Sequence, residues 1–297
     1  MTAAHSHIVT LVASSKAGPL TQQDVARALA YAEGRTVTWL EEGRAVEFPV
    51  RRAPDRSALA AVMTHKAVDI FLTRPRGRRK AVLVADMDCT IVTAETLDEL
   101  AGFAGMKEQV AAITARAMNG ELEFHQAIRE RVGLLKGLPI SALEQAWKEI
   151  RYTPGARTLV ATMNAFGATT ALVSGGFSVF TARVAAELGF AIHRANILLD
   201  NGATLTGEVG EPILDKSAKL AALEELAAAR GVKLTATLSV GDGANDLPML
   251  KAAGLGVAYH AKPVVAAEVV NKVVHTDLTS LLFAQGYPAS SFKGVET

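Results

Sequence analysis

The apolar run Ala81-Val82-Leu83-Val84-Ala85 constrains the fold of this 297-residue chain more than any other feature. A strand in which successive side chains are all apolar is typical of a parallel sheet that is covered on both faces, because both sets of side chains are then buried. The segment that follows, Asp86-Met87-Asp88-Cys89-Thr90, is short and polar. We therefore predict a central buried strand that ends in a polar loop.

Strands and helices alternate after residue 152. Strands are predicted at 169–173, 235–240 and 256–258, and helices at 157–166, 178–188 and 217–229. This alternation predicts an α/β fold with a doubly wound, Rossmann-like parallel sheet. Residues 96–150 are almost wholly helical in pattern, so we interpret them as a cap inserted after the first strand.

The first 75 residues are expected to form a small α+β domain in front of a main domain at 80–297. Its predicted elements are strand 8–13, helix 21–32, strands 36–40 and 45–50, helix 57–66 and strand 68–72. This β-α-β-β-α-β order is compatible with a ferredoxin-like unit. A regulatory role or a homodimer contact is a hypothesis for this domain. We interpret the basic segment 74–80 as a solvated linker rather than a nucleic-acid patch.

Charge and cysteine content limit the possible partners and the compartment. The formal net charge of +1 argues against a dedicated nucleic-acid binder, which needs a concentrated basic surface. Cys89 is the only cysteine, so an intrachain disulfide is impossible and a reducing compartment fits. The sequence contains neither a secretory signal nor an apolar run of the roughly 20 residues that span a membrane. We expect a cytoplasmic protein without a membrane partner.

Polar groups follow the predicted strands at the edge of the sheet where ligands bind. In an open α/β sheet, ligands bind outside the carboxyl ends of the strands. Asp86 and Asp88 follow the first strand, Ser174-Gly175-Gly176 the second and Gly241-Asp242-Gly243-Ala244-Asn245-Asp246 the third, and Lys219 opens the helix between the last two. Each piece is weak alone, since Asp-x-Asp is a common turn and Asp246 is a plausible helix cap. Their order, each after its own strand, favours a shared site.

These groups suit a phosphate ester. Mg²⁺ held by Asp86, Asp242 and the main-chain carbonyl of Asp88 would offset the substrate's charge. Asp86 would attack phosphorus and form an aspartyl-phosphate, while Asp88 would act as general acid and then general base. Ser174, Lys219 and glycine amides would bind the phosphoryl oxygens.

Taken together, the chain resembles the haloacid dehalogenase superfamily and, within it, the phosphoserine phosphatases. The superfamily pattern is Asp-x-Asp-x-Thr at 86–90, Ser174, Lys219 and Gly-Asp-x-x-x-Asp at 241–246. The closer match adds the segments 95–101, 124–132, 153–155, 173–177 and 241–249. The resemblance implies Mg²⁺-dependent hydrolysis of O-phospho-L-serine to L-serine and phosphate, the last step of serine biosynthesis.

The resemblance also implies roles for single residues. Glu95 would bind the substrate ammonium and Arg131 its carboxylate, while Met118 and Phe124 would close over the substrate. Asp246 would support the metal and the lysine. The phosphate-binding residues would be Ser174, Gly175, Lys219 and Asn245. An amino acid needs one anionic and one cationic partner, and arginine binds carboxylate bidentately. Cys89, where a small residue is common in the family, is interpreted as a small loop residue rather than a second nucleophile.

Three other functions use the same scaffold. The phosphoryl group could pass to an acceptor alcohol such as homoserine, which product analysis with and without acceptor would detect. A non-catalytic binding module would not need Asp86, Asp88, Lys219 and Asp242 together. A broad sugar-phosphate phosphatase would leave Glu95 and Arg131 without partners.

Overall fold

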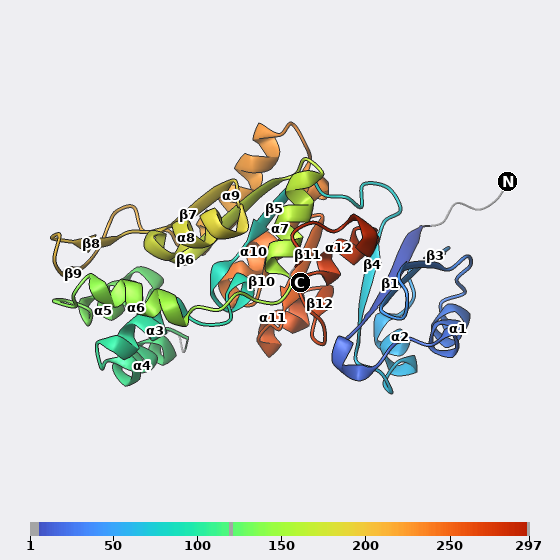
Figure 1. The fold of residues 1–297 in the computed structure, drawn as a ribbon, viewed down its shortest axis with the longest axis horizontal. Helices are drawn as coiled ribbons and strands as arrows, with labels where there is room; N and C mark the ends of the chain where they lie inside the picture. The colour runs from blue at the N-terminus through green and yellow to red at the C-terminus, as the bar shows by residue number, and fades with distance from the viewer. Residues whose placement is uncertain (1–5, 119–120, 296–297) are drawn as a thin grey trace.

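A parallel six-stranded sheet lies at the centre of the chain (Figure 1). The structure is a computed structural model and describes residues 6–118 and 121–295. The strand order is β12-β11-β10-β5-β6-β7. The strands are β5 Val82–Ala85, β6 Thr169–Phe177, β7 Ile192–Asn196, β10 Thr237–Gly241, β11 Leu255–Tyr259 and β12 Asn271–Val273. Since β10, β5 and β6 are neighbours, the three predicted polar loops leave the sheet side by side, and the predicted α/β fold class is confirmed.

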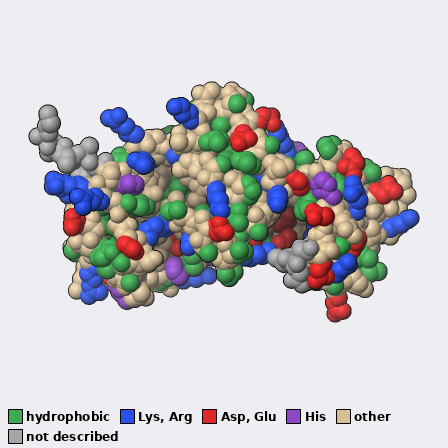
Figure 2. Space-filling model, turned by 180° about the vertical axis from the view of Figure 1, so that it is seen from behind, with side chains coloured by type: hydrophobic (Ala, Val, Ile, Leu, Met, Phe, Trp, Pro, Cys, Tyr) green, Lys and Arg blue, Asp and Glu red, His purple; other side chains and the backbone are tan. Residues whose placement is uncertain are grey.

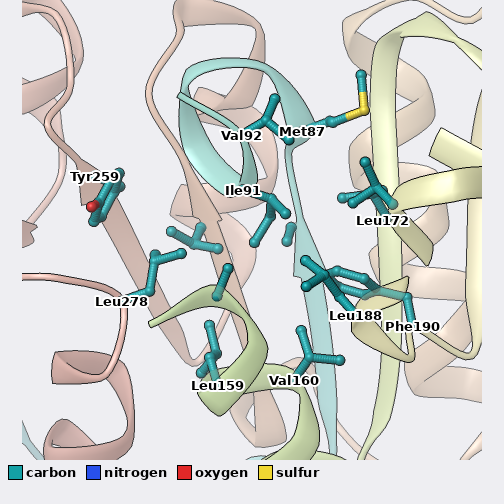
Figure 3. Packing of buried hydrophobic residues seen from close by; sticks show 14 of the residues in the cluster. Met87, Ile91, Val92, Leu159, Val160, Leu172, Leu188, Phe190, Tyr259 and Leu278 are labelled. Atoms are coloured by element: carbon teal, nitrogen blue, oxygen red, sulfur yellow. The ribbon is translucent and has the colours of Figure 1, made fainter. Parts of the chain in front are cut away.

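Both faces of the sheet are covered by helices. One face carries α7 Ala156–Ala165, α8 Ser178–Leu188 and α12 Ser280–Ala284; the other carries α9 Lys216–Ala229, α10 Leu247–Ala252 and α11 Pro263–Glu268. Strand β5 shows why its sequence is continuously apolar. Leu83 and Ala85 pack in the core of the first face, and Val82 and Val84 in that of the second. Figure 3 shows Leu159, Val160 and Leu172 in the first core.

The cap consists of α3 Thr96–Phe103, α4 Lys107–Met118, α5 Phe124–Gly133 and α6 Ser141–Glu149, which agrees with the predicted helical insertion. Its two connections to the core run together. The amide of Thr93 donates to the Arg151 carbonyl at 2.9 Å, and that of Thr153 donates to the Ile91 carbonyl at 2.9 Å. The cap therefore enters and leaves the core through one paired hinge.

A hairpin, β8 Leu198–Asp200 and β9 Leu205–Val209, leaves the core next to β7 and contacts the cap. The amide of Gly137 donates to the Leu205 carbonyl at 2.9 Å, and the Leu205 amide donates to Leu138 at 2.9 Å. The hairpin thus gives the cap a second attachment. Neither the hairpin nor the edge strands β7 and β12 were predicted from the sequence.

The N-terminal domain has the element order and sheet order of a ferredoxin-like unit. Its elements are β1 His7–Ala13, α1 Gln22–Tyr31, β2 Thr38–Glu41, β3 Ala45–Val50, α2 Arg56–Val62 and β4 Val68–Thr73, in an antiparallel sheet of order β2-β3-β1-β4. Helix α1 is capped by Thr21, whose side chain accepts from the Asp24 amide. A homodimer contact through this domain stays a prediction.

This domain is fused to the main domain through the open face of its sheet. Val12 of β1 and Phe71 of β4 belong to the same buried cluster as Phe283 of α12. Asp69, only 3% exposed, accepts hydrogen bonds from the main-chain amides of 274–276, with the Val274 amide at 2.9 Å and the Thr276 amide at 2.9 Å. One carboxylate of β4 thus holds the chain that follows β12.

The linker prediction is wrong for part of the basic segment. The Arg78 side chain is 12% exposed and forms an ion pair with Glu47 at 2.6 Å. Lys80 donates to the Thr235 carbonyl at 2.8 Å, and Arg79 stacks on Tyr287 with 4.5 Å between its guanidinium carbon and the ring centroid. Arg78 also donates to the Ala284 carbonyl at 3.3 Å and so joins the two domains, while Arg79 and Lys80 contact the main domain. Arg74, Arg76 and Arg79 are exposed, as expected for a solvated linker.

Within the described residues, no helix combines the length and the apolar character needed to cross a membrane.

We expect Asp69→Ala to lower the free energy of unfolding by about 3 kcal/mol, because hydrogen bonds to a charged acceptor contribute roughly 1.5–3 kcal/mol. Denaturant unfolding measures the change. Asp200→Ala is the control, since Asp200 is exposed at the end of β8 and accepts one exposed hydrogen bond, from the Gly202 amide at 2.8 Å, so its loss should cost no more than about 1 kcal/mol. An equal, small loss in both variants would contradict the role given to Asp69.

Candidate active site

Asp86 lies directly after β5 and is held by a buried lysine. Its Oδ1 accepts from Lys219 Nζ at 2.7 Å and from the Met87 amide at 2.8 Å. Lys219 lies in the first turns of α9, is 2% exposed, and also contacts Asp246 Oδ1 at 2.6 Å. One buried ammonium therefore joins the loops that follow β5 and β10.

The pKa values in this cluster are shifted because several carboxylates and one ammonium are buried close together. Burial and then the Asp246 carboxylate raise the pKa of Asp86 well above its usual value, while the Lys219 ammonium opposes them. Burial alone would lower the pKa of Lys219, but the two carboxylates outweigh it and raise that pKa, so the amine stays charged. The cluster has fewer positive than negative charges and favours an additional cation.

Asp88 follows in an irregular turn. Its Oδ1 accepts from the Thr96 amide at 2.9 Å, and its Oδ2 accepts from Ser174 Oγ at 3.2 Å. The next residue, Cys89, has a left-handed backbone with φ of 53°, which bends the loop back. Burial raises the pKa of Asp88, so this carboxyl retains a proton to a higher pH than an exposed aspartate.

The end of β6 comes close to Asp88. Ser174 is buried, and its Oγ accepts from the Gly176 amide at 2.8 Å. A Cβ at position 176 would lie 2.9 Å from Asp88 Oδ2, so only glycine fits this approach. Asn196 of β7 donates to the Gly175 carbonyl at 2.9 Å and accepts from the Leu214 amide at 2.7 Å, which braces the turn.

Asp242 and Asp246 occupy the loop after β10. Carboxylate oxygens of Asp86, Asp242 and Asp246 lie within 4.8 Å of one another. Asp246 Oδ2 accepts from the Gly243 amide at 2.9 Å, and its Oδ1 is taken by Lys219. Burial, and then Asp246, raises the pKa of Asp242. Asp86 and Asp242 are therefore the two carboxylates that remain available to a cation.

The cap supplies the other wall of a pocket above these loops. Figure 2 shows the surface hollowed where the main domain meets the cap, with acidic side chains in the hollow. Glu95, Phe124 and Arg131 line the pocket from the cap side. Burial and then the Asp88 carboxylate raise the pKa of Glu95 to about 7. Burial lowers the pKa of Arg131, and Glu95 opposes that shift.

Comparison with known proteins agrees with this geometry. The haloacid dehalogenase-like hydrolase family model matches residues 83–251. The phosphoserine phosphatase of Streptococcus thermophilus is 44% identical over 203 residues, which cover 68% of this chain and 94% of that protein. The chain belongs to the haloacid dehalogenase-like hydrolases and, within them, to the phosphoserine phosphatases. The family prediction is confirmed.

Two further phosphoserine phosphatases show how far the likeness extends. The enzyme of Streptomyces coelicolor is 40% identical over 258 residues, which cover 85% of this chain but 63% of that longer protein. A solved structure, described as a phospho-aspartyl intermediate analogue of phosphoserine phosphatase, has a TM-score of 0.64 and 40% identity; the match covers 69% of this chain and 98% of that one. The likeness to that structure thus leaves about a third of this chain unmatched.

The structure brings the predicted phosphatase residues into one place. The pocket is lined by Asp86, Asp88, Glu95, Phe124, Arg131, Gly175, Asp242 and Asn245, with Ser174, Lys219 and Asp246 buried behind them. The side chain of Met118 lies outside the described residues. Cys89 is half-buried with Sγ 3.7 Å from Glu95 Oε1, and burial raises the pKa of its thiol to about 12, as suits a loop residue rather than a nucleophile.

Sequence reasoning missed several residues of the site. The pocket is also lined by Leu97, Ile128, Phe177 and Lys262, and Asn196 braces it from below. Leu97 and Ile128 are apolar residues of cap helices, which a helical pattern assigns to a core. Lys262 follows β11, which runs parallel to β10 and therefore ends at the same edge of the sheet. That position is the signal by which it could have been found.

Proposed function

We propose that this chain hydrolyses O-phospho-L-serine to L-serine and phosphate, the last step of serine biosynthesis. The observation that carries the proposal is the division of one pocket into two ends. Asp86, Asp88 and Asp242 lie at the sheet, while the opposite charges of Glu95 and Arg131 lie in the cap. The first group suits a phosphate ester, and the second suits an ammonium and a carboxylate. The relatives with this name support the same substrate.

Asp86 is the proposed nucleophile. Lys219 and the Met87 amide hold the carboxylate in place through Oδ1. One carboxylate oxygen forms a bond to phosphorus while the bond from phosphorus to the serine oxygen breaks, which leaves an aspartyl-phosphate, and the other oxygen would bind the metal. Ser174, Lys219, Asn245 and the Gly175 amide would bind the phosphoryl oxygens.

Asp88 moves the proton in both steps. Burial raises its pKa, which favours the protonated form, and we assign to it the proton that passes to the departing serine oxygen. It then takes a proton from water, whose oxygen bonds to phosphorus as the bond to Asp86 breaks. Phosphate leaves, Asp86 is again a carboxylate, and Asp88 is again protonated.

The residues present fit Mg²⁺. The donor set is hard oxygen, from the carboxylates of Asp86 and Asp242, with the Asp88 carbonyl as the proposed main-chain ligand. Burial, and then the Asp246 carboxylate, raises the pKa of both Asp86 and Asp242, and a divalent cation would favour their ionised forms. When bound, the ion would offset the charge of the phosphoryl group. Asp246, with both oxygens engaged, holds Lys219 in place.

The amino-acid end is assigned to the cap. We place the substrate ammonium at Glu95 and the carboxylate at Arg131, with Phe124 and Met118 closing over the substrate. Arg131 Nε donates to the Ala127 carbonyl at 3.3 Å, which fixes the stem and leaves the guanidinium fork for a ligand. We also place the reaction in the cytoplasm, where a chain whose one cysteine is Cys89 needs no disulfide.

Asp86→Asn should lower the rate of phosphate release from O-phospho-L-serine with Mg²⁺ by at least about 1,000-fold, because the amide is not a nucleophile. Circular dichroism checks that the variant is folded. Asp200→Asn, in the exposed hairpin turn, serves as the control and should keep full activity. More than a tenth of the original rate in Asp86→Asn would rule out this nucleophile.

Arg131→Ala should lower kcat/KM for O-phospho-L-serine about 100-fold, since a bidentate charged contact is lost. It should change kcat/KM for phosphoethanolamine, which lacks the carboxylate, by no more than about threefold. Arg129→Ala is the matched control, because Arg129 lies on the same helix and forms a surface pair with Glu211. Equal losses on both substrates would show that Arg131 does not bind the carboxylate.

KM for O-phospho-L-serine should rise as the pH falls below about 7, the pKa of Glu95. The raised pKa means that Glu95 is ionised above this pH and neutral below it, and only the ionised form attracts the substrate ammonium. Steady-state kinetics between pH 5.5 and 8.5 measure the change. Glu95→Gln should remove the dependence, and p-nitrophenyl phosphate, which lacks the amine, should not show it. A pH profile that is the same in Glu95→Gln would refute the assignment.

A further inference from the structure

Lys262 is the one pocket-lining cation, within the described residues, that the proposed reaction does not use. The carboxylates of the lining belong to Asp86, Asp88, Glu95 and Asp242, and its cations to Arg131 and Lys262. Arg131 is assigned to the amino-acid end, and Lys219 lies behind the pocket with Asp86 and Asp246. The substrate brings a phosphate dianion into this acidic pocket, so an additional cation at its mouth has an evident use.

The main chain places Lys262 beside the loop of Asp242. Its amide donates to the Asp242 carbonyl at 3.3 Å, and its carbonyl accepts from the Val265 amide at 2.9 Å. The preceding turn is fixed as well. His260 has a left-handed φ of 41°, and its amide donates to the Val273 carbonyl of β12 at 2.8 Å. The side chain of Lys262 therefore starts from a held position at the edge of the pocket.

The side chain itself remains available to a ligand. It is exposed, and among the described residues no hydrogen bond or ion pair engages its ammonium. Its charge nevertheless reaches both ends of the pocket, because it lowers the pKa of Asp242 and of Glu95 against the larger effect of burial. Lys262 thus lines the pocket together with Asp242 of the phosphate end and Glu95 of the amino-acid end.

A local structural role does not account for a lysine here. Lys262 is the residue before α11, where serine, threonine, aspartate and asparagine are favoured because they accept from the first amides. Its side chain makes no such capping bond, and a cation at a helix N-terminus is opposed by the helix dipole. A lysine at this position is therefore unfavourable for helix α11, but its positive charge suits an anionic ligand.

We propose that Lys262 is a further substrate-binding residue, which captures the phosphate dianion at the mouth of the pocket and holds it before the chemical steps. The inference rests on the proposed function in that it assumes a phosphomonoester as substrate. It does not depend on the amino-acid end, because the recognised group is the phosphate. Lys262 therefore acts on capture and on KM, and has little effect on kcat.

The test uses Lys262→Gln, Lys262→Arg and the control Lys233→Gln, which removes an exposed lysine outside the pocket. The whole chain is assayed with Mg²⁺ on O-phospho-L-serine and p-nitrophenyl phosphate at about 50 and 300 mM salt, and with inorganic phosphate as inhibitor.

Lys262→Gln should lower kcat/KM about tenfold on both substrates, leave kcat within about twofold and weaken phosphate inhibition about tenfold. The salt dependence of kcat/KM should become shallower. Lys262→Arg should stay within about threefold of the original chain.

Three results would overturn the proposal: unchanged kcat/KM and phosphate inhibition in Lys262→Gln, a loss confined to O-phospho-L-serine, or a loss equal to that in Lys233→Gln. Failure of the proposed function is separable from these. If O-phospho-L-serine is not a substrate, p-nitrophenyl phosphate and phosphate inhibition still report on Lys262.

Discussion

The buried ammonium of Lys219 between Asp86 and Asp246 is the interaction on which the site depends. It lies 2.7 Å from one carboxylate and 2.6 Å from the other. A buried ion pair of this kind costs several kcal/mol of desolvation per ion, and removing one partner leaves a charge without compensation. The ammonium connects α9 to the loops that follow β5 and β10. Gly241 allows this approach, since a Cβ there would lie 2.4 Å from Asp246.

The N-terminal domain contacts segments that support the site, although none of its residues lines the pocket. Asp69 holds the amides that follow β12, and Arg44 forms an ion pair with Asp277 at 3.0 Å. The next residue, Leu278, donates to the Pro154 carbonyl at 3.1 Å, beside the hinge of the cap. The solved relative with 40% identity matches only 69% of this chain, so the main domain can exist in the family without these contacts. Here the segment 274–279 links the added domain to the hinge.

The sequence predicted what depends on local pattern and on the direction of parallel strands. The apolar run at 81–85 predicted a strand with two buried faces, and the polar ends of successive strands predicted that Asp86, Ser174 and Asp242 would meet. What it missed depends on partners far away in the chain. The sequence pattern around Arg78 predicts a solvated charge, and only the fold shows that it pairs with Glu47. The edge strands β7 and β12 are short and partly polar, so their pattern is weak. Lys262 has the sequence context of an ordinary surface lysine, and only the fold shows that it lines the same pocket as Glu95.

The cap couples recognition to chemistry through the start of α3. Glu95, the residue before this helix, is assigned to the substrate ammonium, and the Thr96 amide next to it donates to Asp88 Oδ1 at 2.9 Å. Under the proposed function, adjacent residues thus contact the amino-acid end of the substrate and the general acid. Because both are carried by the cap, a cap displaced about its hinge at Val92 and Tyr152 would lose both contacts at once. Under the proposed function, a phosphate ester that fails to engage the cap would meet a poorly oriented acid, so the amino-acid end contributes to rate as well as to binding.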